Sequence, residues 1–157
     1  MKRILILLAV LIAAVVAVKA AEPEPVRWRT IVKQTGPDTG TVTFRALVGE
    51  GWHLYGTELP ADGPRPTTFD LSGSRGVKFT GEPTPVRAAV KARDELFGAT
   101  LEWWDANIDF VVPFTLTSPD DARLEATISY MACNGETCRP PKAEKIATPI
   151  RFKTQDK

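Results

Sequence analysis

Two cysteines near the C-terminal end are the residues of this chain whose types and spacing point most directly to chemistry. Cys133 and Cys138 are its only cysteines, they enclose four residues, and Pro140 and Pro141 follow the second one. In an oxidising compartment, such a pair forms either a structural disulfide or one that exchanges with other thiols. Two cysteines are a weak signal by themselves, so the spacing leaves both alternatives open.

The residues around the pair indicate how its backbone is shaped. Asn134 and Gly135 tolerate positive φ angles, so the loop can bend and bring the two sulfurs together. Pro140 disfavours helix at Arg139, which keeps the second cysteine on extended, stiff backbone. On the chain-entropy model, so short a loop stabilises a fold by about 2 kcal/mol. That is a modest contribution for a domain large enough to fold by its core, and a surface disulfide is open to attack by a thiolate.

Alternation of apolar and polar residues dominates the rest of the chain and predicts β-strands. The clearest run is 108–116, and another, 124–130, leads towards the cysteines. Cys133 has the opposite parity to the apolar face of that second run, so we expect it to leave the core face as the chain turns. Residues 88–93 lack clear periodicity. The other predicted strands are 26–32 and 41–48, which form a hairpin, then 52–56, 67–71, 77–80, 101–104 and a last one containing Ile146, Ile150 and Phe152.

This pattern predicts an all-β protein. Seven to nine short strands with turn signals between them, and no amphipathic helix longer than two turns, favour one domain with an immunoglobulin-like antiparallel β-sandwich. The connections are expected to be Greek-key, and a small barrel is the alternative. The two cysteines are too close in sequence to bridge two sheets as they do in antibody domains.

The N-terminus has the pattern of a signal peptide. Lys2 and Arg3 precede the apolar run 4–18, and Val18-Lys-Ala20 is typical of a signal peptidase site. We therefore expect residues 1–20 to be cleaved and residues 21–157 to form the mature periplasmic domain. An uncleaved anchor is the alternative, although the run is shorter than the roughly 18 residues expected of a spanning helix.

Composition argues against several classes of partner. The chain has 20 basic and 19 acidic residues, which does not favour nucleic acid or an anionic membrane. One histidine, His53, and two cysteines cannot supply a four-ligand zinc site unaided. We expect no metal, no cofactor and a monomeric protein, with His53 a packed or surface residue.

Three stretches resemble one known family. Residues 128–141, Ile-Ser-Tyr-Met-Ala-Cys-Asn-Gly-Glu-Thr-Cys-Arg-Pro-Pro, resemble the signature of the periplasmic N-terminal domain of the thiol:disulfide interchange protein DsbD. Residues 51–55, Gly-Trp-His-Leu-Tyr, resemble its Gly-aromatic-x-Leu-Tyr strand, and residues 94–98, Asp-Glu-Leu-Phe-Gly, its acidic-aromatic-Gly cap loop. The resemblance covers essentially the whole mature domain, and the family fold is immunoglobulin-like.

The resemblance implies a thiol:disulfide oxidoreductase of the protein-disulfide reductase type, which serves as an electron carrier in electron transport and cytochrome c biogenesis. Its implied partners are thioredoxin-fold proteins and a membrane electron transporter of the DsbD type. Cys138 would bond the partner and Cys133 would resolve the mixed disulfide. No transmembrane segment or thioredoxin-like domain follows before Lys157, so we expect a separate protein as electron donor. The alternatives are an immunoglobulin-like binding module with a structural disulfide and, less favoured, a metal chaperone using both cysteines and His53.

The resemblance also assigns roles to the 94–98 loop. Asp94 and Glu95 would lie close to the sulfurs and raise the thiol pKa values by disfavouring the thiolate. Leu96 and Phe97 would shield the disulfide, and since the usual aromatic position carries Leu96, either could be the cap. The aromatic residues expected near the sulfurs are Trp52 and Tyr55.

Overall fold

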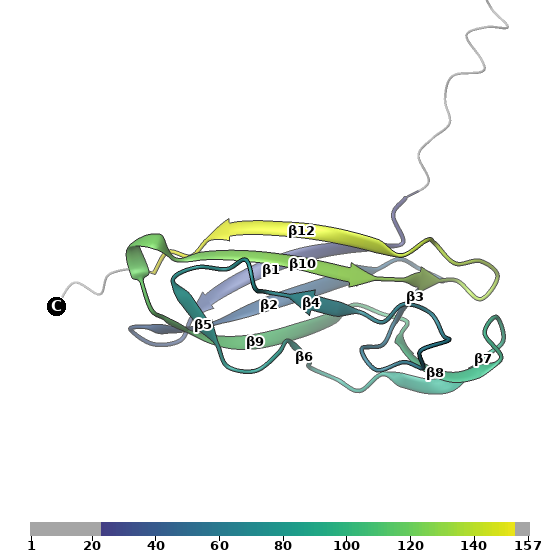
Figure 1. The fold of residues 1–157 in the computed structure, drawn as a ribbon. Helices are drawn as coiled ribbons and strands as arrows, with labels where there is room; N and C mark the ends of the chain where they lie inside the picture. The colour runs from purple at the N-terminus through teal and green to yellow at the C-terminus, as the bar shows by residue number, and fades with distance from the viewer. Residues whose placement is uncertain (1–22, 153–157) are drawn as a thin grey trace, which may run out of the picture.

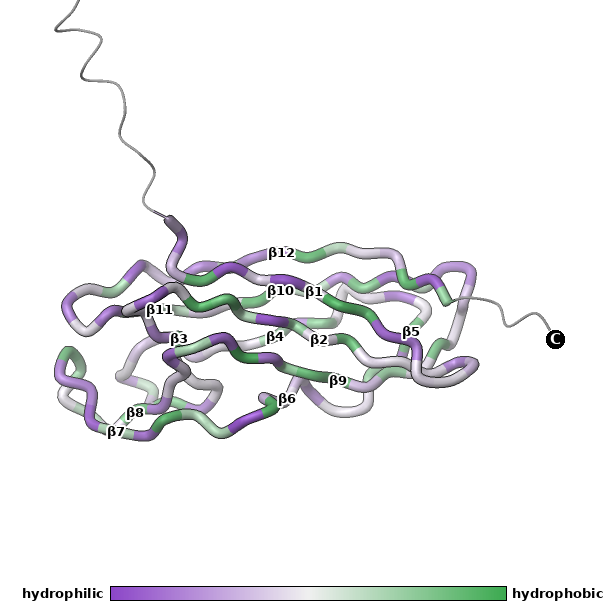
Figure 2. The backbone as a smooth tube through the Cα atoms, turned by 180° about the vertical axis from the view of Figure 1, so that it is seen from behind, coloured by the Kyte–Doolittle hydropathy of each residue, from purple (hydrophilic) through white to green (hydrophobic). Residues whose placement is uncertain are grey.

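Antiparallel pairing of alternating strands builds the whole described structure, residues 23–152 of the computed structural model. The predicted signal peptide, residues 1–20, lies outside this range. In β10 every second side chain is buried, and Figure 2 shows similar alternation of hydrophobic and hydrophilic residues along the long strands. The described residues form twelve strands in three sheets and one short 3-10 helix, η1 (Pro119–Asp121).

The strands fall into sheets as follows. The first sheet consists of β1 (Val26–Gln34), β2 (Thr39–Val48), β9 (Ile108–Leu116), β5 (Val77–Phe79) and β6 (Thr84–Pro85), with β5 and β6 both pairing β9. The second sheet has the order β12 (Lys142–Pro149), β10 (Arg123–Tyr130) and β4 (Thr68–Asp70). The third has the order β11 (Ala132–Cys133), β3 (His53–Tyr55), β8 (Ala99–Trp104) and β7 (Val90–Asp94).

Aromatic side chains fill the space between the first two sheets. Trp28 of β1 lies 5.8 Å from Phe69 of β4 and 5.6 Å from Tyr130 of β10, measured between ring centroids. Phe69 also lies 4.9 Å from Phe110 of β9. These contacts join one sheet to the other, as in a sandwich with a shared apolar core. The predicted all-β, immunoglobulin-like antiparallel sandwich is therefore confirmed.

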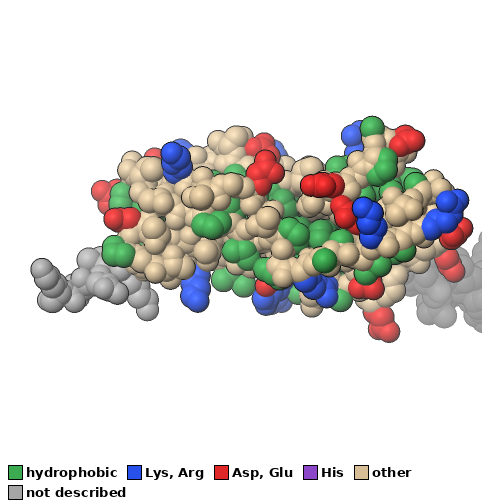
Figure 3. Space-filling model, turned by 90° about the horizontal axis from the view of Figure 1, so that it is seen from below, with side chains coloured by type: hydrophobic (Ala, Val, Ile, Leu, Met, Phe, Trp, Pro, Cys, Tyr) green, Lys and Arg blue, Asp and Glu red, His purple; other side chains and the backbone are tan. Residues whose placement is uncertain are grey.

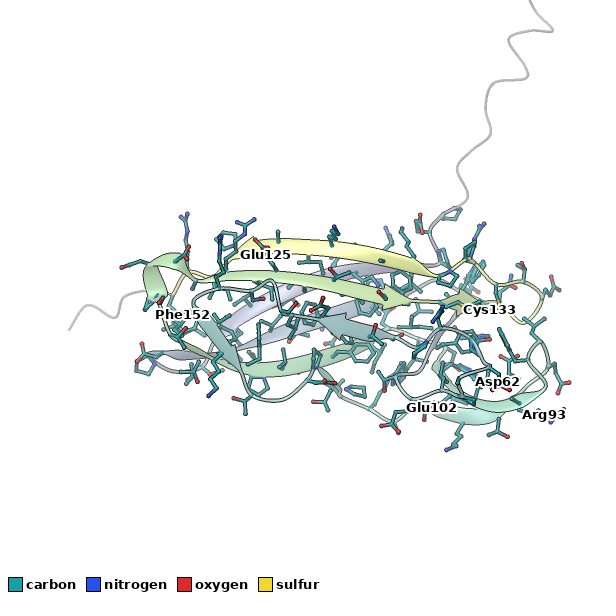
Figure 4. All side chains as sticks on the ribbon, viewed as in Figure 1. Asp62, Arg93, Glu102, Glu125, Cys133 and Phe152 are labelled. Atoms are coloured by element: carbon teal, nitrogen blue, oxygen red, sulfur yellow. A yellow bond between two sulfur atoms is a disulfide. The ribbon has the colours of Figure 1, made fainter. Side chains whose placement is uncertain are left out.

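The third sheet lies at one end of the sandwich (Figure 1). β10 leads to this end and is followed there by β11, which pairs with β3 rather than with the second sheet. In Figure 4, Cys133 and Arg93 lie at this end and Phe152 at the opposite one. The cysteine loop and the β7–β8 hairpin therefore belong to the same small region.

Several strand predictions need correction. Residues 88–93 lack clear periodicity and were not among the predicted strands, but β7 begins at Val90. It is an edge strand with mostly exposed side chains, so it needs no apolar alternation. β6 and β11 have two residues each, too few to show a period. The last strand ends at Pro149, so Ile150 and Phe152 follow it. Ile150 is still held, because its N–H bonds to the carbonyl of Ala122 at 2.8 Å.

The surface carries charges of both signs. The face seen in Figure 3 shows basic and acidic side chains interspersed among exposed hydrophobic groups. The described residues include no helix with the length and apolar character that crossing a bilayer requires.

Candidate functional site

Cys133 and Cys138 form a disulfide with a Cα–Cα distance of 4.1 Å. Two local features close the loop between them. Gly135 has a φ of +84°, in the region that favours glycine. The side-chain Oδ1 of Asn134 accepts hydrogen bonds from the backbone N–H groups of residues 136 and 137, at 3.1 and 2.9 Å. Asn134 thus shapes the loop through its side chain, because Gly135 alone in this loop has a positive φ.

The two cysteines differ in exposure. Cys133 is 0% exposed, whereas Cys138 is partly exposed. Ala132 belongs to the main core and Cys133 to a second cluster, so Cys133 leaves the main core face as its parity predicted. The expectation of a disulfide open at the surface is wrong for Cys133, because a second set of apolar side chains covers it there. Of the two residues, only Cys138 offers a surface to an approaching molecule.

The second cluster occupies one face of the third sheet. Its fully or almost fully buried members are Tyr55, Leu101 and Cys133. Residues that pair directly in antiparallel strands project from the same face of a sheet. The strand register therefore lets residues that are far apart in the sequence contribute to this one cluster. The partly buried hydrophobic residues that pack against the cluster are Leu59, Phe97, Ala99, Trp103, Met131 and Cys138.

Asp94 is a buried acidic residue at the end of β7, with 6% of its surface exposed. Its Oδ2 accepts a 2.7 Å hydrogen bond from the hydroxyl of Tyr55. Its Oδ1 accepts bonds from the backbone N–H groups of Leu96 and Phe97, at 2.9 and 3.1 Å. Burial and this bond to Asp94 raise the pKa of Tyr55, so its hydroxyl stays protonated and remains a donor. One carboxylate therefore fixes the hairpin turn to the strand beside the disulfide.

In the hairpin turn, the residues of the predicted cap loop differ in how far they are buried. Phe97 packs against the second cluster, with its ring 5.9 Å from that of Tyr55 and nearly perpendicular to it. Leu96 is 45% exposed. The side chain of Glu95 is 85% exposed and reaches within 4.0 Å of Arg93. The structure thus brings Asp94 and Phe97 to the disulfide cluster, while Glu95 and Leu96 face solvent.

Trp52 contacts the residue that follows the second cysteine. It packs partly against the main core, and the guanidinium carbon of Arg139 lies 5.6 Å from the centroid of its ring. A cation at this distance from an aromatic face is attracted to it. Trp52 therefore supports the residue next to Cys138, whereas Tyr55 belongs to the cluster around Cys133.

His53, which is predicted to be a packed or surface residue, also lies in this region. In the register of β3 and β11 it lies directly opposite Cys133. Its ring is 4.9 Å from that of Tyr55 and 5.2 Å from that of Trp103. Its parity relative to Tyr55 is visible in the sequence, but its pairing with Cys133 is not, because β11 has only two residues.

Metal-binding side chains do not cluster within the described residues. Residues 23–152 contain no group of three or more His, Cys, Asp or Glu side chains that could hold a metal ion.

Comparisons with known proteins show what this chain is similar to. Residues 20–150 match the family described as thiol:disulfide interchange protein DsbD, N-terminal. No protein with a curated description matches the chain by sequence. The crystal structure of the N-terminal periplasmic domain of ScsB from Proteus mirabilis is similar, with a TM-score of 0.56 and 11% identity, over 83% of this chain and 48% of that one. The chain thus spans about half the length of that structure, and the likeness is one of fold. The yeast GGA1 GAE domain gives a TM-score of 0.43 and 7% identity, over 83% of this chain and 96% of its own.

Proposed function

Because this chain belongs to the family of the N-terminal domain of the thiol:disulfide interchange protein DsbD, we propose that it is a periplasmic relay that passes electrons through the Cys133–Cys138 pair. The family assignment makes it a thiol:disulfide interchange domain. The proposal adds that electrons come from a membrane transporter or a thioredoxin-like donor and go to thioredoxin-fold proteins. It is thus a protein-disulfide reductase type of oxidoreductase. Residues 1–20 are its signal peptide and 21–157 the mature domain.

The unequal burial of the two cysteines carries this proposal. Exchange begins when a thiolate attacks one sulfur in line with the disulfide, so the attacked sulfur must be accessible. Cys138 is partly exposed and Cys133 is not. Cys138 therefore forms the mixed disulfide with the partner. When the chain accepts electrons, the donor's thiolate attacks Cys138, Cys133 leaves as the thiolate, and the donor's second thiol completes the reduction. When it passes them on, the thiolate of Cys138 attacks the partner's disulfide, and Cys133 then attacks Sγ of Cys138 to release the reduced partner.

The cap loop provides selectivity in this proposal. Phe97 packs against the cluster that contains Cys133, so in this proposal it shields the buried side of the disulfide. The charge of Asp94, which Tyr55 binds within the same cluster, disfavours a nearby thiolate and holds the reduced pair unreactive until a partner docks. Glu95 faces solvent beside Arg93, so its part in this effect is smaller.

Trapping of mixed disulfides tests the proposal. Cys133→Ser, incubated with a thioredoxin-fold protein in its disulfide form, should accumulate a covalent adduct through Cys138, because the resolving thiol is absent. The matched variant Cys138→Ser should accumulate little or none. Mass spectrometry of the adducts identifies the linked cysteine. Adducts chiefly at Cys133 would reverse the two roles, and no adduct from either variant would favour a structural disulfide in a binding module.

A further inference from the structure

His53 is a partly buried titratable group, with 14% of its side chain exposed, that the relay described above does not use. It is the one histidine of the chain and lies directly opposite Cys133 in the β3–β11 register. Directly opposed residues of an antiparallel pair project from the same face, with Cβ atoms about 5 Å apart. The imidazole and the side chain of Cys133 are therefore neighbours.

The Nε2 atom of His53 is buried and has no hydrogen-bond partner among the described residues. Unsatisfied buried polar atoms are uncommon in folded proteins and call for an explanation. This nitrogen lies 3.9 Å from Oδ2 of Asp94, too far for a hydrogen bond but within reach of an ion pair once it is protonated. Oδ2 already accepts the hydroxyl of Tyr55, and a carboxylate oxygen has room for a second donor.

Four titratable groups surround the imidazole. Three lie in strands of the third sheet, and the fourth follows its remaining strand. They are Cys133 of β11, Tyr55 of β3, Asp94 of β7 and Asp105 after β8. Burial lowers the pKa of His53, while the charges of Asp94 and Asp105 oppose that effect. The resting imidazole is neutral near pH 7, and a proton that reaches it is balanced by a carboxylate.

We propose that His53 is the general base that deprotonates Cys133 when Cys133 resolves the mixed disulfide, with Asp94 balancing the imidazolium charge. The inference rests on the proposed function, which makes Cys133 the resolving thiol. A thiolate is the nucleophile in disulfide exchange, and a buried thiol ionises poorly without a nearby proton acceptor. The neutral, unpaired nitrogen beside Asp94 supplies one.

The step balances in atoms and electrons. Cys133 gives its proton to His53, and the resulting thiolate attacks Sγ of Cys138. A bond forms between the two sulfurs of the pair while the bond from Cys138 to the partner breaks. The partner sulfur leaves as a thiolate with both electrons of that bond. The proton on His53 then passes through solvent to the partner thiolate.

Stopped-flow reaction of the reduced protein with dithiobis(nitrobenzoate) separates this step from the attack before it. The reagent is a small chromogenic disulfide. Attack by Cys138 releases the first thionitrobenzoate in a phase whose rate depends on reagent concentration. Displacement by Cys133 releases the second in a phase that does not, and the rate of this second phase reports resolution.

His53→Gln removes the base while keeping a polar side chain of similar size. We expect its first phase to stay within about twofold and its second phase to slow by about a hundredfold, the low end of general-base effects. Trp103→Phe is the matched control, because it alters packing on the imidazole without removing the base, and it should keep the second phase within about twofold. An unchanged second phase in His53→Gln overturns the inference.

The unsubstituted protein gives a second readout that does not depend on how a variant folds. Because His53 is the one imidazole, proton NMR gives its pKa directly, and the second-phase rate should rise with pH through that same value. Inflections at different pH values overturn the inference. The single-cysteine variants separate this failure from that of the relay. Cys133→Ser should keep the concentration-dependent first phase and Cys138→Ser should slow it, whatever His53 does; the reverse pattern would mean that the assignment of Cys133 itself is wrong.

Discussion

The hydroxyl of Tyr55 donates a 2.7 Å hydrogen bond to the carboxylate of Asp94, thirty-nine residues further along the chain. The same carboxylate accepts the backbone N–H of Phe97 at 3.1 Å. Tyr55 and Cys133 belong to one buried cluster. The position of the cap loop is thus coupled through one carboxylate to the strand that packs beside the disulfide.

The first prediction concerns the stability of this link. Tyr55→Phe leaves Oδ2 of Asp94 buried without its donor, which should cost about 1–3 kcal/mol in the free energy of unfolding. Tyr130→Phe is the matched control, because its buried hydroxyl makes a longer bond, 3.4 Å, to the carbonyl of Val26. Urea unfolding compares the two variants. Equal losses in the free energy of unfolding would mean that the Tyr55–Asp94 bond stabilises the fold no more than the Tyr130 bond does.

A second prediction distinguishes the two apolar residues of the cap loop. Phe97→Ala should speed reduction of the disulfide by small thiols such as dithiothreitol, because Phe97 packs on the cluster that contains Cys133. Leu96→Ala should change that rate little, since Leu96 is 45% exposed. Rates are followed by alkylation of the freed thiols. A larger effect from Leu96→Ala would transfer the cap role to that residue.

The third prediction is that the disulfide contributes little to the fold. Replacing both Cys133 and Cys138 with alanine should leave a cooperatively unfolding sandwich that is less stable by about 2 kcal/mol, since the closed loop is short. Denaturant titration measures the loss, and the near-ultraviolet circular dichroism checks the aromatic core. An unfolded double variant would indicate a structural staple instead.

Alkaline pH supplies the fourth prediction. The chain has two tyrosines. Burial raises the pKa of Tyr130 to about 12, and burial with the bond to Asp94 raises the pKa of Tyr55 above its ordinary value. A raised folded-state pKa stabilises the fold below the unfolded value, near pH 10, and that stability declines as the pH rises above it.

We therefore expect tyrosinate absorbance and loss of circular dichroism to appear together above pH 10. Absorbance that titrates with a midpoint near pH 10 in a folded protein would contradict the burial of the two hydroxyls.

The sequence by itself determined the class of fold and the position of the disulfide. The alternation in 108–116 and 124–130 requires one buried and one exposed face, and β9 and β10 follow those segments closely. The parity of Cys133 already separated it from the main core. These features are local, because a strand with one buried face must show its period in the residues themselves.

Only the tertiary structure decided what surrounds Cys133 and which of Leu96 and Phe97 packs against its cluster. β11 is too short to carry a period, so nothing in the sequence pairs Cys133 with His53. Leu96 and Phe97 are adjacent and both apolar, and the turn that Asp94 closes selects Phe97 for burial. Long-range pairing and the direction of a side chain in a turn depend on contacts between distant segments, which local composition does not encode.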